Sequence, residues 1–158
     1  MRSPVLRVLR RFRHDGGANL VEAALIFPVL ILLVYALFEF AIILYIQMAL
    51  QNGVNQGARF AITRSLLPDM SREQSIRKVV KDEIPSLKIT DANISFSHMG
   101  LSESSWSSGT GPANSVERVT VTYTYPIMSI AMKPFFGNKS TLTFTSHATM
   151  KNEGDPES

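Results

Sequence analysis

The feature that most constrains this chain is an apolar run between Ala23 and Leu50. Over these positions Glu39 is the only charged side chain, and Gln47 is the only other strongly polar one. A helix of this length extends about 42 Å at 1.5 Å per residue, whereas the hydrocarbon core of a bilayer is about 30 Å thick. The run therefore predicts a membrane-spanning helix that continues beyond the far side of the membrane. It is too long for the apolar region of a cleaved secretory signal, and no clear A-x-A site follows it.

Positive charge is concentrated ahead of the apolar run, in residues 1–17. Five arginines and Asp15 give this segment a charge of +4, whereas the whole chain carries +3. The arginines are Arg2, Arg7, Arg10, Arg11 and Arg13. By the positive-inside rule, a basic leader of residues 1–17 stays in the cytoplasm and the C-terminal part crosses the membrane. The basic pI thus comes from the leader and gives no argument for nucleic-acid binding.

Beyond the apolar run the helix becomes amphipathic. Apolar and small residues recur at steps of three and four: Ile46, Ala49, Leu50, Gly53, Val54, Gly57, Ala58, Ala61 and Ile62. Small residues on this face allow another element to approach closely, and Arg59 is among the polar residues between them. We expect one transmembrane and amphipathic helix over residues 18–66, loosened near its start by Pro28 and ended by Pro68.

The following residues, 67–150, predict a small α+β domain. A second helix begins after Ser71, with Gln74 as its capping-box partner, and closes at Pro85. Apolar and polar residues then alternate in residues 92–97, 118–125 and 142–149, which is the pattern of β-strands. One strand face is apolar and the other is rich in threonine. The predicted fold is thus α+β: a long N-terminal helix and a second helix packed on a small antiparallel sheet of about three strands.

Two connections and the C-terminal tail complete the domain. Residues 99–115 are rich in Ser and Gly and are expected to be mobile, with Trp106 either folded back on its own domain or contacting a partner. Residues 127–137 are apolar and form a short helix or lie against the membrane or a partner. The tail, 151–158, is expected to be disordered.

No catalytic or metal site is predicted. The absence of cysteine excludes thiol catalysis, disulfides and cysteine-ligated metals. The three histidines, His14, His98 and His147, are scattered, and no known catalytic or nucleotide-binding motif is present. The chain is therefore not expected to be an enzyme or to need a cofactor.

Two carboxylates in or beside the apolar run need an explanation. A charged side chain near the centre of a bilayer costs about 2.5–3.5 kcal/mol on insertion scales and usually has a partner. Glu22 has no basic residue within two turns after it. If the chain were cut after Gly17, the new α-amine of Ala18 would lie one helical turn from Glu22, and the amine of one subunit could pair with Glu22 of its neighbour. Glu39 either lies close enough to the far interface to stay hydrated or makes a contact within a bundle of helices.

These positions resemble those of a known family. Gly17 followed by residues 18–22, ANLVE, resembles the processing site of type IV pilins and pseudopilins, where prepilin peptidase cuts after the glycine. The longer pattern comprises Gly17, Val21, Glu22, Ala24, Pro28, Leu30, Glu39, Leu50, Gly57, Ala58 and Arg59. Over residues 16–64 it resembles the TadE-like family, minor pilins or pseudopilins of the tight-adherence (Flp-type) pilus. One position departs from the pilin pattern, because Ala23 stands where an aromatic residue often follows the glutamate.

The resemblance implies a function and a location. A single-pass protein of the bacterial inner membrane would carry its domain on the periplasmic or extracellular side. Its partners would be prepilin peptidase, other pilins and the tight-adherence machinery, and it would act in pilus assembly through helix packing. The alternative is a membrane-tethered extracytoplasmic binding domain, for which the identities of Gly17 and Glu22 would not matter.

Overall fold

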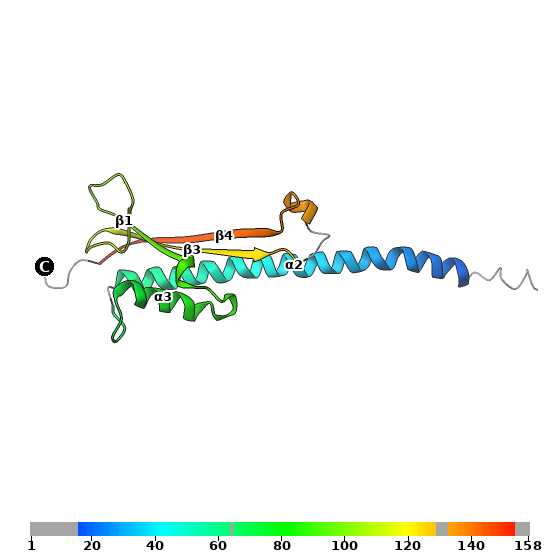
Figure 1. Ribbon diagram of the computed structural model, residues 1–158, viewed down its shortest axis with the longest axis horizontal. Helices are drawn as coiled ribbons and strands as arrows, with labels where there is room; N and C mark the ends of the chain where they lie inside the picture. The colour runs from blue at the N-terminus through cyan, green and yellow to red at the C-terminus, as the bar shows by residue number, and fades with distance from the viewer. Residues whose placement is uncertain (1–15, 64, 129–132, 154–158) are drawn as a thin grey trace, which may run out of the picture.

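The computed structural model describes residues 16–63, 65–128 and 133–153, and these form one elongated molecule (Figure 1). Helix α2 (Gly16–Ile62) runs along most of its length, and a small domain packs on the C-terminal half of this helix. The remaining elements are α3 (Arg72–Glu83), η1 (Pro85–Leu87), η2 (Asp91–Asn93), β1 (Ile94–Met99), β2 (Ser107–Ser108), β3 (Val116–Pro126), η3 (Lys133–Phe136) and β4 (Thr141–Lys151). The predicted α+β fold is confirmed.

Helix α2 is continuous over 47 residues and ends four residues before the predicted boundary. Its last carbonyl groups are taken by groups outside the helix. The Thr63 hydroxyl donates to the carbonyl of Phe60 at 2.9 Å, and the Glu153 N–H donates to that of Ile62 at 3.2 Å. Because carbonyls at a helix end have no partner inside the helix, these bonds end α2 before Pro68 is reached.

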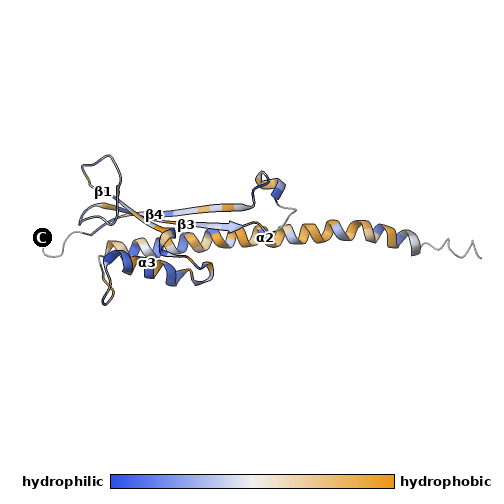
Figure 2. Ribbon diagram, in the orientation of Figure 1, coloured by the Kyte–Doolittle hydropathy of each residue, from blue (hydrophilic) through white to orange (hydrophobic). Residues whose placement is uncertain are grey.

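The two halves of α2 differ in burial. Side chains between Asn19 and Phe38 are exposed, apart from half-buried Ala36, and Figure 2 shows this half as almost uniformly hydrophobic. From Glu39 onward one face is buried at steps of three and four, by Glu39, Ile43, Ile46, Leu50, Val54, Ala58 and Ala61. The bare part, residues 16–38, extends about 34 Å. It is therefore long enough to cross a bilayer without the second half of the helix.

The sheet is antiparallel, with strand order β2-β1-β3-β4. The central strand β3 places Val119 opposite Phe96 of β1 and Ala148 of β4, and these side chains face the helices. The predicted strands are present, and β2 is an addition within the connection expected to be mobile. Its two exposed serines pair with Ser97 and His98 and carry no apolar alternation, so the sequence pattern could not indicate a strand there.

The outer face of the sheet is polar, as the alternation predicted. Thr122 and Thr145 face each other across β3 and β4 with their hydroxyl oxygens 3.4 Å apart. Trp106 lies under the guanidinium group of Arg118, 3.8 Å from ring centroid to Cζ, and so folds back on its own domain. His147 is exposed on the same face.

Helix α3 begins as predicted. The Ser71 hydroxyl accepts from the Gln74 N–H at 3.3 Å, and the Gln74 side chain accepts from the Ser71 N–H at 2.9 Å, which completes the capping box. The helix ends at Glu83, and Pro85 opens the short η1 helix. The buried residues of α3 lie against α2 and the sheet; they are Ser75, Ile76 and Val80.

The domain extends beyond the boundary expected from the sequence. Lys151 is the last residue of β4, and Asn152 is buried, with its N–H bonded to the carbonyl of Ser115 at 2.8 Å. The boundary predicted at residue 151 is therefore too early, because the backbone of residues 151–153 is still hydrogen-bonded to the rest of the chain. Residues 154–158 of that predicted tail lie outside the described residues.

Candidate functional site

The predicted processing site lies in the first turn of α2. Gly17 is exposed, and a Cβ atom placed on it would meet nothing within 4 Å. The bond between Gly17 and Ala18 therefore lies at the free end of the bare helix, far from the folded domain (Figure 1). The predicted leader, apart from Gly16 and Gly17, lies outside the described residues.

Glu22 lies one turn further along the bare helix and is exposed. Within the described parts of the chain, no side chain forms an ion pair or hydrogen bond with it. Glu22 is about 24 Å from Phe38 along the helix axis, so the domain cannot supply a partner. A partner would have to come from the N-terminal end of this chain or from another molecule.

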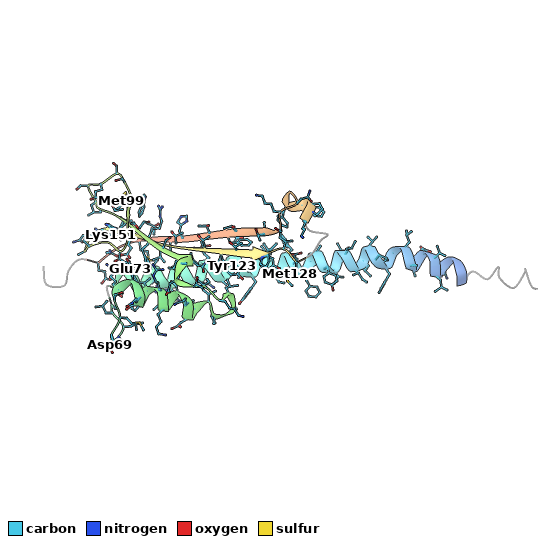
Figure 3. All side chains as sticks on the ribbon, in the orientation of Figure 1. Asp69, Glu73, Met99, Tyr123, Met128 and Lys151 are labelled. Carbon is cyan, nitrogen blue, oxygen red and sulfur yellow. The ribbon has the colours of Figure 1, made fainter. Side chains whose placement is uncertain are left out.

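Glu39 lies where α2 meets the domain. It is only 4% exposed, and its Oε1 accepts a hydrogen bond from the backbone N–H of Met128 at 2.8 Å. Figure 3 places Met128 beside α2, at the end of the domain nearest the bare helix. The carboxylate of Glu39 thus holds the chain after β3 against α2. A role for Glu39 in subunit pairing stays a prediction.

A mainly apolar cavity of about 360 Å³ adjoins this contact. It is lined by Tyr35, Phe38, Glu39, Ile42, Tyr125 and Met128. The Tyr125 hydroxyl is buried and has no hydrogen-bond partner among the described residues. Burial raises the pKa of Tyr125, and the nearby carboxylate of Glu39 raises that pKa further.

Tyr125→Phe is expected to leave the free energy of unfolding unchanged or raise it by up to about 1 kcal/mol, because a buried hydroxyl without a partner is a cost. Folding raises the pKa of Tyr125, so ionising its hydroxyl costs more in the folded chain than in the unfolded one. The free energy of unfolding is therefore constant with respect to this group below the unfolded pKa of about 10, and it falls as pH rises past that value. Urea unfolding in detergent at pH 8 and above pH 10 measures both effects. Tyr123→Phe is the matched control, and a large loss at pH 8 in Tyr125→Phe would show that the hydroxyl has a partner.

The predicted small-residue face packs within one subunit. A Cβ on Gly53 would overlap the side chain of Ile84, and one on Gly57 would overlap Val80. Ala58 is buried beside them. The element that approaches this face closely is therefore α3 and the chain just after it.

Two other residues of the predicted packing set lie away from this contact. Arg59 is exposed on the outer side of α2, and Pro28 lies in the bare part of the helix. Neither therefore contributes to the packing of α3 on α2.

A polar cluster at the far end of the domain was not foreseen. Arg72 donates to Glu117 Oε2 at 2.7 Å and to the carbonyl of Ala61 at 2.9 Å, and Asn152 donates to the same Oε2 at 3.0 Å. Glu117 precedes Val119 by two residues, so the alternation of β3 places it on the inner face. That alternation was the one signal that could have indicated a buried carboxylate.

Among the described residues, no group of three or more His, Asp or Glu side chains is arranged to hold a metal ion. The chain matches no curated protein and no solved structure. Within residues 16–63, 65–128 and 133–153, one helix, α2, is long and apolar enough to cross a membrane. Residues 17–59, all of them within α2, match the family model of TadE-like proteins, which confirms the resemblance noted in the sequence.

Proposed function

We propose that this chain is a minor pilin- or pseudopilin-like subunit that acts in assembly of a tight-adherence (Flp-type) pilus. The basic leader lies in the cytoplasm, the bare part of α2 crosses the inner membrane, and the domain lies outside. The observation that carries the proposal is the match of residues 17–59 to TadE-like proteins, on a helix whose side chains from residue 19 to residue 35 are all exposed.

The bare half of α2 offers a surface for other helices. Its large apolar side chains are exposed on every side, including Leu25 and Phe27. In a bilayer, lipid covers such a surface, and in a bundle of pilin helices the same surface packs against neighbours. Since the domain covers only the second half of α2, helix packing between subunits needs no rearrangement of the domain.

Processing would supply a partner for Glu22, which has none among the described residues. Prepilin peptidase would cut after Gly17 and leave the α-amine of Ala18 as a cation at neutral pH. This amine lies about 6 Å along the axis from Glu22. The amine of one subunit would pair with Glu22 of the next, which offsets the cost of desolvating both charges and fixes the axial register between subunits.

Glu22→Gln is therefore expected to leave insertion and folding intact and to reduce assembled pili by tenfold or more, since losing one partner of a desolvated pair costs about 3–5 kcal/mol. Electron microscopy counts the pili, and protease accessibility of the domain in spheroplasts reports insertion. The matched control is Glu83→Gln, which changes an exposed glutamate at the end of α3. Normal pili in Glu22→Gln cells would contradict the proposal and favour the membrane-tethered binding domain.

A further inference from the structure

The connection between β3 and β4 presents two apolar side chains that the domain does not cover. Met128 is 80% exposed and Phe135 is 81% exposed. They are the most exposed large apolar side chains in the described chain, above those on the bare part of α2. We call the described part of this connection, residues 127–128 and 133–140, the hairpin tip. Two such side chains on one connection make it a candidate for contact with lipid or with a protein partner, and its position and charge decide between them.

The hairpin tip lies at the level where the bare helix begins. The Met128 N–H donates to Glu39, and Glu39 is the first residue of α2 that the domain buries. From this level to Gly16 the bare helix extends about 34 Å, close to the thickness of a bilayer. In Figure 1 the orange η3 helix lies at this end of the domain, and in Figure 3 Asp69 and Lys151 lie at the opposite end. A membrane crossed by the bare helix therefore has its outer surface at the tip.

The hairpin tip is held in a defined shape. Phe136 packs against the hydrophobic core, whereas its neighbour Phe135 does not. The Asn138 N–H donates to the carbonyl of Lys133 at 2.8 Å, and the Ile127 N–H donates to that of Ser140 at 2.9 Å. One phenylalanine thus fixes η3 to the domain while the other stays available.

The charge of the hairpin tip matches a lipid surface. Lys133 and Lys139 are its only charged residues, so its described part carries two positive charges. Apolar side chains flanked by lysines are typical of segments that lie in the interfacial region of a membrane, where lysine reaches the lipid phosphates.

We propose that the hairpin tip inserts Met128 and Phe135 into the outer interface of the bilayer that α2 crosses, with Lys133 and Lys139 toward anionic headgroups. The mainly apolar cavity beside Glu39 shares Met128 with the hairpin tip and so lies at the same level. The domain then contacts the membrane at two points, which fixes its orientation relative to the membrane plane. This inference requires that α2 spans a membrane and does not depend on pilus assembly.

A single tryptophan tests the depth of the hairpin tip. Trp106 is the only tryptophan in the chain, so Phe135→Trp in a Trp106→Phe background reports on position 135 alone. The full-length variant is reconstituted in vesicles of phosphatidylethanolamine and phosphatidylglycerol, with or without bromine on the acyl chains near the headgroup. We expect the indole at position 135 to emit at shorter wavelength and to lose most of its emission in brominated vesicles. The unmodified chain, with Trp106 at the far end, should keep its emission.

Two outcomes would overturn the proposal. Equal emission from position 135 in both kinds of vesicle at long wavelength would place the tip in water. Equal emission at short wavelength would show that protein covers it. Lys133→Glu combined with Lys139→Glu is expected to reduce the quenching in vesicles with phosphatidylglycerol and not in vesicles of phosphatidylethanolamine alone. Unchanged quenching of the double lysine variant in both lipid mixtures would show that the two lysines do not contact anionic headgroups.

Circular dichroism is the folding control. Because all these positions lie outside the core, the spectra of the variants should match that of the unmodified chain.

Discussion

Gly17→Ala is expected to abolish processing while leaving the folded chain unchanged. Intact mass should show the unmodified chain beginning at Ala18 in cells with active prepilin peptidase, and the variant retaining residues 1–17. The position is exposed, and the added methyl group meets nothing within 4 Å. Loss of cleavage would then come from the protease's requirement for glycine and not from a change in the substrate's fold.

Gly53→Ala is the matched control for this experiment. The same change now adds a methyl group where it overlaps Ile84, which is buried and cannot move aside freely. Overpacking costs about 1–3 kcal/mol, partly offset by about 1 kcal/mol from the higher helix propensity of alanine. We expect a less stable domain that is still cut at Gly17. Cleavage of Gly17→Ala, or a mature chain that starts at Met1, would refute processing at this site.

The helices could be predicted because their signals are local. The steps of three and four along α2 lie within one segment, and Ser71 and Gln74 of the capping box are three residues apart. The end of α2 could not be placed in the same way. It depends on the N–H of Glu153, which lies 91 positions after Ile62. Strand β2 was missed for a similar reason, since only its pairing with β1 defines it.

The candidate site was predicted in part. The apolar run alone shows that Glu39 needs a partner, but one partner observed is the backbone N–H of Met128, 89 residues away. A backbone group leaves no mark on side-chain patterns, so the alternatives for Glu39 could not be separated from sequence. Gly17 and Glu22 could be proposed from the sequence because their expected roles depend on neighbours within five positions, and these roles stay predictions.

The polar cluster at the far end was the least predictable feature. Its members come from α3, from the start of β3 and from the residue after β4. Together they join these elements to the carbonyl of Ala61 at the end of α2. No local pattern relates Arg72 to Glu117, although the Arg72 guanidinium donates to the Glu117 carboxylate at 2.7 Å.

Removing either charge of this cluster is expected to destabilise the domain by about 3–5 kcal/mol, since the remaining charge loses its partner in a buried place. Glu117 is 2% exposed and Arg72 is 16% exposed. Urea unfolding of the detergent-solubilised chain measures Arg72→Met and Glu117→Leu singly. The control is the exposed pair of Lys78 and Asp82, where Asp82→Ala should cost less than about 1 kcal/mol.

The double variant, Arg72→Met with Glu117→Leu, decides why the cluster matters. Arg72 Nε and Glu117 Oε1 are buried and have no hydrogen-bond partner among the residues that the structure describes, so the pair is incompletely satisfied there. Replacing both charges removes that cost together with the ion pair, and the loss should be smaller than the sum of the single losses by about 0.5–3 kcal/mol. A loss equal to the sum would mean that the bonds from Arg72 to backbone carbonyls, and not its pairing with Glu117, hold the far end of the domain on α2.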